Sequence, residues 1–179
     1  MSSEPSPHHH APGVHTPLYQ LLCGCSQDLV ASVERRLRTS DTPHYQASEP
    51  DLLHERVARL VGAFLEATCA GIEPFVSHVR HVADERADEG YFLEEVQAAL
   101  SGLEERAWQL LVERAEPARL VPLLAFVTGL VGAAKDELAR VYLRHKERAE
   151  LRAAQLQQKL DELFKGTEQP DGDVFLVRG

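Results

Sequence analysis

The stretch "DERADEGYFLEEVQAAL", residues 84 to 100, places a glycine and two aromatic side chains between two segments that favour helix. A helix that ends in a Schellman motif needs a residue with positive φ after its last turn, and only glycine adopts that conformation without steric cost. Gly90 therefore predicts the end of one helix. Glu94 and Glu95 suit the N-terminal end of the following helix, which carries a partial positive charge. The stretch predicts two consecutive helices joined by a tight turn.

The helix before this turn is expected to carry Pro74 in its first turn, because proline is tolerated there. Another helix precedes it, with Ser48 as its N-cap and its end near Gly71. Apolar residues recur in both at spacings of three and four, which is typical of amphipathic helices. The residues from Leu18 to Leu37 follow the same spacing and predict one helix, and the stretch after it, rich in Ser, Thr and Pro, predicts a loop.

After the turn, a helix is expected from Leu93 to just before Pro117. The segment "LVPLLAFVTGLVGAA", residues 120–134, is apolar on most sides and is interpreted as a buried core helix. It contains a proline and two glycines and is shorter than the roughly 18 apolar residues that span a bilayer, so a membrane span is not expected. From residue 133 to 165 there is no proline or glycine, which predicts one long C-terminal exit helix. The fold class predicted from these patterns is an all-α bundle of about six helices.

The exit helix carries a narrow apolar stripe close to that of a coiled coil. Its spacings are 4, 3, 4, 4, 3, 4 and 3 residues, and its members are Leu138, Tyr142, His145, Ala149, Ala153, Leu156, Leu160 and Leu163. A stripe of this kind on a helix longer than the rest of the domain would be left in water without a partner helix. We therefore predict a homodimer, with packing of the stripe on the protein's own bundle as the alternative.

The composition indicates a folded protein with no affinity for nucleic acid. Of 179 residues, 44% are hydrophobic and 26% are charged, and the net charge is −9, with acidic and basic residues mixed along the same segments. No basic stripe for phosphates is present in this pattern. The three cysteines are too few and too unevenly spaced for a disulfide framework, and the N-terminal residues lack the features of a signal peptide. These features predict a cytoplasmic protein with no membrane partner.

Residues 1–16 are rich in Pro, Ser and His and are expected to be a disordered tail, and residues 166–179 a flexible one, leaving 17–165 as the helical domain. His8, His9 and His10 are adjacent on the first tail and lack the fixed geometry of a structural zinc site, so no metal site is assigned. The second tail ends in a short β-prone run that could dock to a partner, namely Val174, Phe175, Leu176 and Val177.

No catalytic motif for a hydrolase, nucleotide-binding protein or metalloprotease occurs in the sequence, so no enzymatic activity and no catalytic residue is predicted. His78 and His81 are candidates for a haem ligand. At 100° per residue they lie about 100° and 160° from the apolar stripe, which favours a position outside the core, and no cofactor is predicted. A small-molecule pocket could lie near Phe126, Trp108 and Tyr91.

Three stretches together resemble the N-terminal sensory domain of RsbT co-antagonist proteins, the RsbR-type regulators of the stressosome. They are "HYQASEPDLLHERVARLVGAFLEA" (44–67), "FVSHVRHVADERADEGYFLEEVQAALSGLEERAWQLL" (75–111) and "LVGAAKDELARVYLRHKERAEL" (130–151). The shared features are Tyr45 before a helix, Arg86 with Ala87, Gly90, and the long last helix. The phosphorylatable or kinase domain that usually follows in that family is not found in this sequence.

The resemblance implies a globin-like helical fold without haem and dimerisation partly through the exit helix. It also implies a role as a sensory or scaffolding module of bacterial stress signalling that acts on a separate signalling or scaffold protein. Two alternatives remain open. One is a haem- or cofactor-binding globin-like sensor, and the other is a cargo or adaptor protein that docks through its C-terminal tail.

Overall fold

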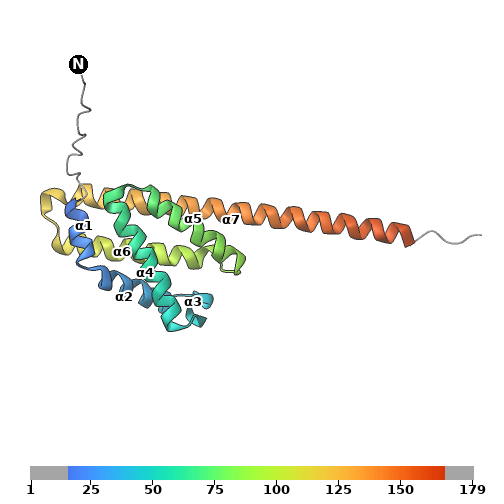
Figure 1. Cartoon of the computed structure of the whole chain (residues 1–179), viewed down its shortest axis with the longest axis horizontal. Coiled ribbons are helices and arrows are strands. Elements are labelled where there is room, and N and C mark those ends of the chain that lie inside the picture. Colours follow the sequence, from blue (N-terminus) through green and yellow to red (C-terminus); the bar gives the residue numbers. More distant parts are fainter. Residues whose placement is uncertain (1–15, 168–179) are drawn as a thin grey trace, which may run out of the picture. The chain divides into compact units, whose positions relative to one another are not determined.

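The computed structural model describes residues 16–167, with side chains described for residues 18–164. This part of the chain is all-α and contains no strand. Its helices are α1 (Thr16–Cys23), α2 (Ser26–Thr39), α3 (Pro43–Ala47), α4 (Pro50–Ala70), α5 (Glu73–Asp88), α6 (Leu93–Arg114) and α7 (Pro117–Thr167) (Figure 1). The all-α class and the long last helix are confirmed.

The chain divides into two compact units, the first ending at Tyr142 and the second beginning at Leu143. We call the first unit the helical body. It contains α1–α6 and the first part of α7. The second unit contains the rest of α7, which we call the exit segment. The terminal tails predicted for residues 1–16 and 166–179 lie outside the described residues, apart from the ends of α1 and α7.

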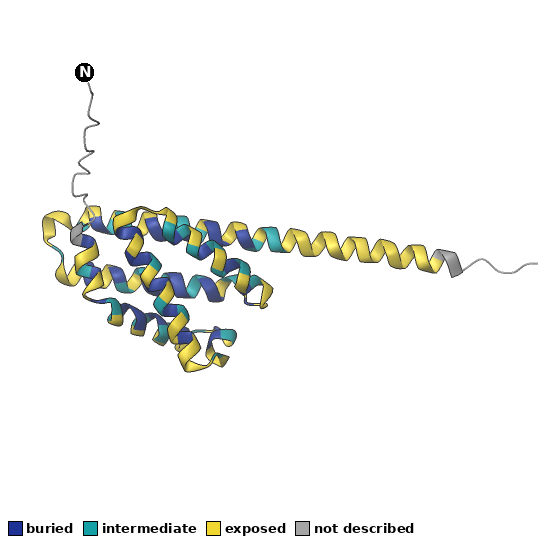
Figure 2. Cartoon of the chain, in the orientation of Figure 1, coloured by how far each residue is buried: buried dark blue, intermediate teal, exposed yellow. Residues whose placement is uncertain are grey.

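The core of the helical body is built from the inner faces of its helices. Within it, α2 packs against α6 and α4, and α4 packs against α5. Phe64 of α4 and Phe75 of α5 are fully buried and meet edge to face, with ring centroids 5.6 Å apart. Buried residues gather on these inner faces in Figure 2. The apolar residues recur at spacings of three and four in the sequence, and this spacing places them on the inner face of each helix.

The turn at Gly90 has the predicted geometry. Gly90 has φ of +85°, the amide of Gly90 donates to the Ala87 carbonyl at 3.2 Å, and the amide of Tyr91 donates to the Arg86 carbonyl at 2.9 Å. These two bonds are the pair that defines a Schellman motif. Pro74 and Pro50 lie in the first turns of α5 and α4, and Gly71 ends α4, as predicted.

Three helix boundaries differ from the prediction. The segment 18–37 forms two helices, because the chain turns at Gly24 and Cys25 between α1 and α2 without losing the apolar spacing. The predicted loop after it contains the short helix α3. The N-cap of α4 is Glu49 rather than Ser48, whose hydroxyl instead donates to the His44 carbonyl at 2.9 Å.

The largest difference concerns the last two predicted helices, which form the single helix α7. Gly129 and Gly132 lie inside it with helical neighbours, and Pro122 falls in its second turn. Pro122 removes one main-chain hydrogen bond of the helix and each glycine costs about 1 kcal/mol at most, but both costs are offset by the burial of Leu123, Val127 and Leu130 in the core. Neither residue type therefore ends the helix, and the predicted start at residue 133 is wrong.

Figure 2 shows that residues 146–164 of the exit segment are exposed. By length and composition alone, α7 is also apolar enough to cross a membrane, since one 18-residue window reaches a mean hydropathy of 1.6 and only 28% of that window is buried. This is weak support for a membrane span, because core helices of water-soluble proteins pass the same test.

Candidate functional site

The helical body contains a cavity of about 140 Å³ lined mainly by α4, α5 and α6, with Leu37 of α2 and Tyr45 of α3 also in its wall. One part of its wall is apolar and consists of Leu37, Val57, Leu60, Val79, Val82, Val96, Ala99 and Leu100. The other part is polar and consists of Tyr45, Arg56, Arg59, His78, His81, Glu85 and Arg86. Apolar walls with a few converging polar groups are typical of small-molecule sites. We call this the cationic cavity.

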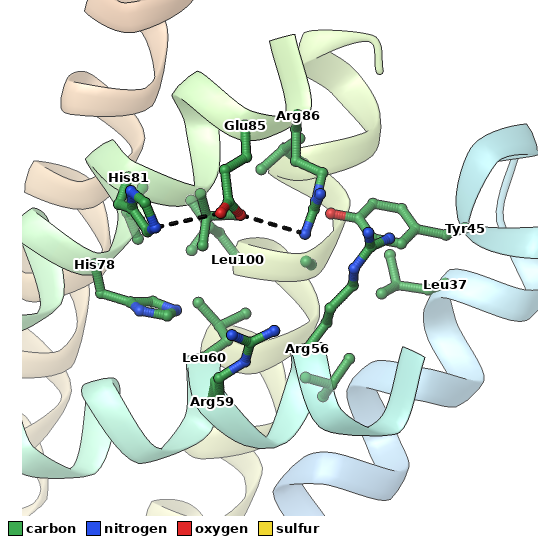
Figure 3. A pocket seen from close by; sticks show the side chains of 15 residues that line it. Leu37, Tyr45, Arg56, Arg59, Leu60, His78, His81, Glu85, Arg86 and Leu100 are labelled. Atoms are coloured by element: carbon green, nitrogen blue, oxygen red, sulfur yellow. Dashed lines mark ion pairs between the residues drawn. The ribbon is translucent and has the colours of Figure 1, made fainter. Parts of the chain in front are cut away.

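Helix periodicity brings the polar residues together. On α5, His78, Val82 and Glu85 are separated by four and three residues, so their side chains lie on one face of the helix. On α4, Arg56 and Leu60 are four residues apart and face the same space. Figure 3 shows the His78 ring, the Arg59 guanidinium and the Glu85 carboxylate pointing toward one another from these two helices.

Arg86 is the most buried charged group of the cavity wall, with only 4% of its side chain exposed. Its Nη1 pairs with Glu89, its Nη2 lies 3.7 Å from Glu85, and its guanidinium lies 5.3 Å from the ring centroid of Tyr91. Its Nε is buried and has no hydrogen-bond partner. A buried cation requires compensation by carboxylates and aromatic rings, and here one donor remains unused.

Arg56, a second arginine of the cavity wall, also contacts Tyr91. Its Nη1 donates to the Tyr91 hydroxyl at 2.9 Å, and its Nη2 lies 3.5 Å from Glu89. Tyr91 is buried and packs against Tyr45, with ring centroids 5.0 Å apart. Burial raises the pKa of Tyr45 to about 12, so its hydroxyl keeps its proton at neutral pH. Arg56, Arg86 and the two tyrosines form one connected cluster beside the cavity.

His78 is half-buried, and its Nε2 is a second buried atom without a partner. Burial lowers the pKa of His78 below its ordinary value of 6.5, and the positive charge of Arg59 acts in the same direction. The ring is therefore neutral at pH 7. His81 is different, because its side chain is 74% exposed and its Nε2 lies 3.2 Å from Glu85.

The cavity is too small for a haem. A volume of about 140 Å³ is below the roughly 300–1,000 Å³ usual for drug-sized ligands, and a haem is at least that large. Both histidines line the cavity, but His81 is mostly exposed at its edge, as the helical geometry predicted, whereas His78 lies deeper than predicted. Among the described residues, no group of three or more His, Cys, Asp or Glu side chains is arranged to hold a metal ion.

The predicted apolar stripe is divided between the two units. Leu138 is fully buried in the core of the helical body and Tyr142 is half-buried against it, so neither is available to a partner. His145 is half-buried. The remaining five members are exposed, namely Ala149, Ala153, Leu156, Leu160 and Leu163. The predicted docking residues Val174, Phe175, Leu176 and Val177 lie outside the described residues.

The cationic cavity was not predicted from the sequence. The pocket suggested near Phe126, Trp108 and Tyr91 is not the cationic cavity, since none of the three lines it and Trp108, which is 41% exposed, lies at a separate surface hollow of α6. One feature of the sequence did indicate a buried cation at this site. Arg86 lies seven residues after Val79 and three after Ala83, on the inner face of α5. An arginine at such an apolar position indicates a buried cation.

The fold and the site thus define an all-helical protein with a small cationic cavity in its helical body. No family model, curated protein or solved structure matches this chain.

Proposed function

We propose that this protein is a non-enzymatic, dimeric sensory or scaffolding module of bacterial signalling, which works in the cytoplasm and acts on a separate protein by contact. The resemblance of the segment from about residue 18 to 165 to the sensory domain of RsbR-type regulators supports this proposal, as does the all-α fold with its long last helix. On the same basis we propose a globin-like arrangement of the helical body without haem.

The observation that carries the proposal is the exposed apolar stripe of the exit segment. From Ala149 to Leu163 its members are spaced by 4, 3, 4 and 3 residues, which is the heptad spacing of a coiled coil. Leu156 is 62% exposed and Leu160 is 48% exposed. Burying these side chains against a second helix would remove apolar surface from water, which favours association.

The spacing also explains why only part of the predicted stripe is exposed. His145, Ala149 and Ala153 are separated by four residues each time, and two successive spacings of four shift the stripe around the helix. Upstream of this shift, Leu138 and Tyr142 face the core of the helical body. Downstream of it, the regular heptad begins. The upstream residues pack in the core of the helical body, and the exposed downstream residues form the surface that we propose contacts a partner helix.

The charges that flank the stripe favour a parallel pair. With Ala153 and Leu160 at heptad position a, Arg152 and Lys159 occupy position g. In an antiparallel pair the g positions of the two helices face each other, which brings like charges together. In a parallel pair, position g faces the position e that lies five residues further along the partner helix, so Arg152 faces the uncharged Gln157 and Lys159 faces Phe164. We therefore propose a parallel homodimer.

The proposal is tested by sedimentation equilibrium of the full chain at tens of micromolar. The wild type should be a dimer, and the double variant Leu156→Glu/Leu160→Glu should be a monomer. Leu151→Glu is the matched control. Leu151 is 65% exposed on the same helix but lies about 140–180° around it from the other two leucines. A monomeric wild type, or a control as disruptive as the double variant, would refute the proposal.

A further inference from the structure

We propose that the cationic cavity binds a small monocarboxylate with an apolar body, of about the size of benzoate, and that this ligand is what the helical body senses. The sensory role of this ligand rests on the proposed function. The binding of a monocarboxylate rests on the charge of the cavity wall, its unused hydrogen-bond donors and the size of the cavity.

The charge of the cavity wall favours an anion. Three arginines line the cavity, whereas Glu85 is its only carboxylate among the described residues. Glu89 lies nearby but serves both Arg56 and Arg86. Arg59 lies 3.8 Å from Glu55, in a pair exposed to water that contributes little. One further carboxylate would therefore meet guanidinium groups that the protein's own acids leave incompletely neutralised.

Two buried nitrogen atoms in the cavity wall have no partner. These are Nε of Arg86, whose side chain is almost completely buried, and Nε2 of His78. Buried polar atoms are nearly always hydrogen-bonded in folded proteins, so two such atoms beside one cavity call for an explanation. Figure 3 shows that His78 and Arg59 approach the same space as Glu85 and Arg86. A ligand with acceptor oxygens would provide what these groups lack.

The size and the apolar wall define the rest of the ligand. A cavity of about 150 Å³ accommodates benzene, and this one measures about 140 Å³. Leu60, Val82 and Leu100 offer contacts to a ring or a short branched chain. A second charge on the ligand would have to lose its hydration against these side chains, which disfavours dicarboxylates and phosphorylated compounds. One carboxylate and one small apolar group fit the space.

The test is calorimetric titration of the full chain with sodium benzoate. We expect saturable one-to-one binding with a dissociation constant of about a millimolar or tighter. Benzamide, which has nearly the same shape without the charge, should bind at least about tenfold more weakly, and so should chloride or phosphate. Absence of saturable binding, or equal binding of benzamide or of an inorganic anion, would overturn the proposal.

Two variants assign the binding to this cavity. Arg59→Gln should weaken benzoate binding by about tenfold or more, because it removes one charge of the wall. Arg119→Gln is the matched control, since Arg59 and Arg119 have side chains 59% and 60% exposed and only Arg59 lines the cavity. Val82→Phe should fill the cavity and abolish binding while circular dichroism shows a folded protein. Unchanged binding in Arg59→Gln would overturn the assignment whether or not Val82→Phe folds.

The same experiments separate this inference from the proposed function. If benzoate fails to bind and the wild type is a dimer, the ligand assignment is refuted and the dimeric module stands. If benzoate binds and the wild type is a monomer, the cavity assignment stands and the proposed dimer is refuted.

Discussion

The hydroxyl of Tyr142 donates a hydrogen bond to the main-chain oxygen of Tyr91 across 3.1 Å. Tyr142 is the last residue of the helical body, and α7 continues from it into the exit segment. Tyr91 follows the Gly90 turn and contacts two of the three arginines of the cationic cavity, Arg56 through its hydroxyl and Arg86 through its ring. This bond joins the surroundings of the cavity to the point where the exit segment begins.

Replacing Tyr142 by Phe should lower the free energy of unfolding by about 0.5–1.5 kcal/mol, the usual contribution of one hydrogen bond. The ring, which packs against the core, is retained. Urea denaturation of wild type and variant measures the difference. An unchanged stability would show that the bond does not contribute to the fold.

If the cavity is the sensory site, benzoate should change the dissociation constant of the wild-type dimer by about fivefold or more. The Tyr142→Phe variant should show a smaller change, because the bond that links the cavity cluster to α7 is missing. Sedimentation equilibrium with and without benzoate measures both. An equal change in the two proteins would remove this hydrogen bond from the proposed coupling.

Gly90→Ala should destabilise the protein by about 1–2 kcal/mol, because an alanine at φ of +85° is strained. The nearest matched substitution is Gly62→Ala in the middle of α4. A β-carbon at Gly62 would meet no atom within 4 Å, and the backbone there is helical, so alanine should stabilise the protein by about 0.5–1 kcal/mol. Thermal unfolding of the two variants should shift in opposite directions, and shifts of the same sign would contradict this account.

Glu95→Ala should destabilise the protein by about 2–4 kcal/mol. The carboxylate of Glu95 is buried and accepts hydrogen bonds from the amides of Phe92 and His44, each at 2.9 Å, and lies 2.7 Å from Nδ1 of His44. Its removal leaves two main-chain donors without a partner. Glu94 is exposed in the same helical turn, so Glu94→Ala should cost no more than about 1 kcal/mol. Similar losses in both variants by urea denaturation would contradict the role given to Glu95.

Acidification should destabilise the protein through His78. The pKa of His78 in the folded protein is below its ordinary value of 6.5, chiefly because of burial. Between the folded and the ordinary pKa the unfolded chain binds more protons, so this contribution to stability is complete above about pH 6.5 and is lost as the pH falls through the folded pKa. Titration of the His78 ring by NMR should give a midpoint below 6.5. A midpoint above 6.5 would contradict the burial of this ring.

Much of the fold could be predicted because it depends on local geometry. Gly90 has to adopt a positive φ after α5, and Pro50 and Pro74 fit only the first turns of α4 and α5, so the sequence indicates these boundaries directly. The continuity of α7 could not be predicted in this way. Pro122 and Gly129 weaken a helix locally, and packing of the residues around them against the helical body outweighs that effect.

The cationic cavity could not be predicted for a different reason. Arg56 and Arg59 lie on α4, while His78 and Arg86 lie on α5, and no sequence spacing shows that these residues meet across two helices. The position of Arg86 on the inner face of α5 was the only signal. The exposed stripe, in contrast, follows from heptad spacing within one helix, although its upstream end was misplaced because Leu138 belongs to the core.

The parallel pairing of exit segments is tested most directly by cysteine cross-linking. In a chain whose own cysteines are replaced as Cys23→Ser, Cys25→Ala and Cys69→Ser, the substitution Ala153→Cys places one thiol at position a of the proposed seam. Two such thiols face each other in a parallel, in-register dimer. Mild oxidation should therefore yield a covalent dimer on a non-reducing gel, and Leu151→Cys in the same background should not. A failure of Ala153→Cys to cross-link, or equal cross-linking of Leu151→Cys, would contradict the parallel dimer.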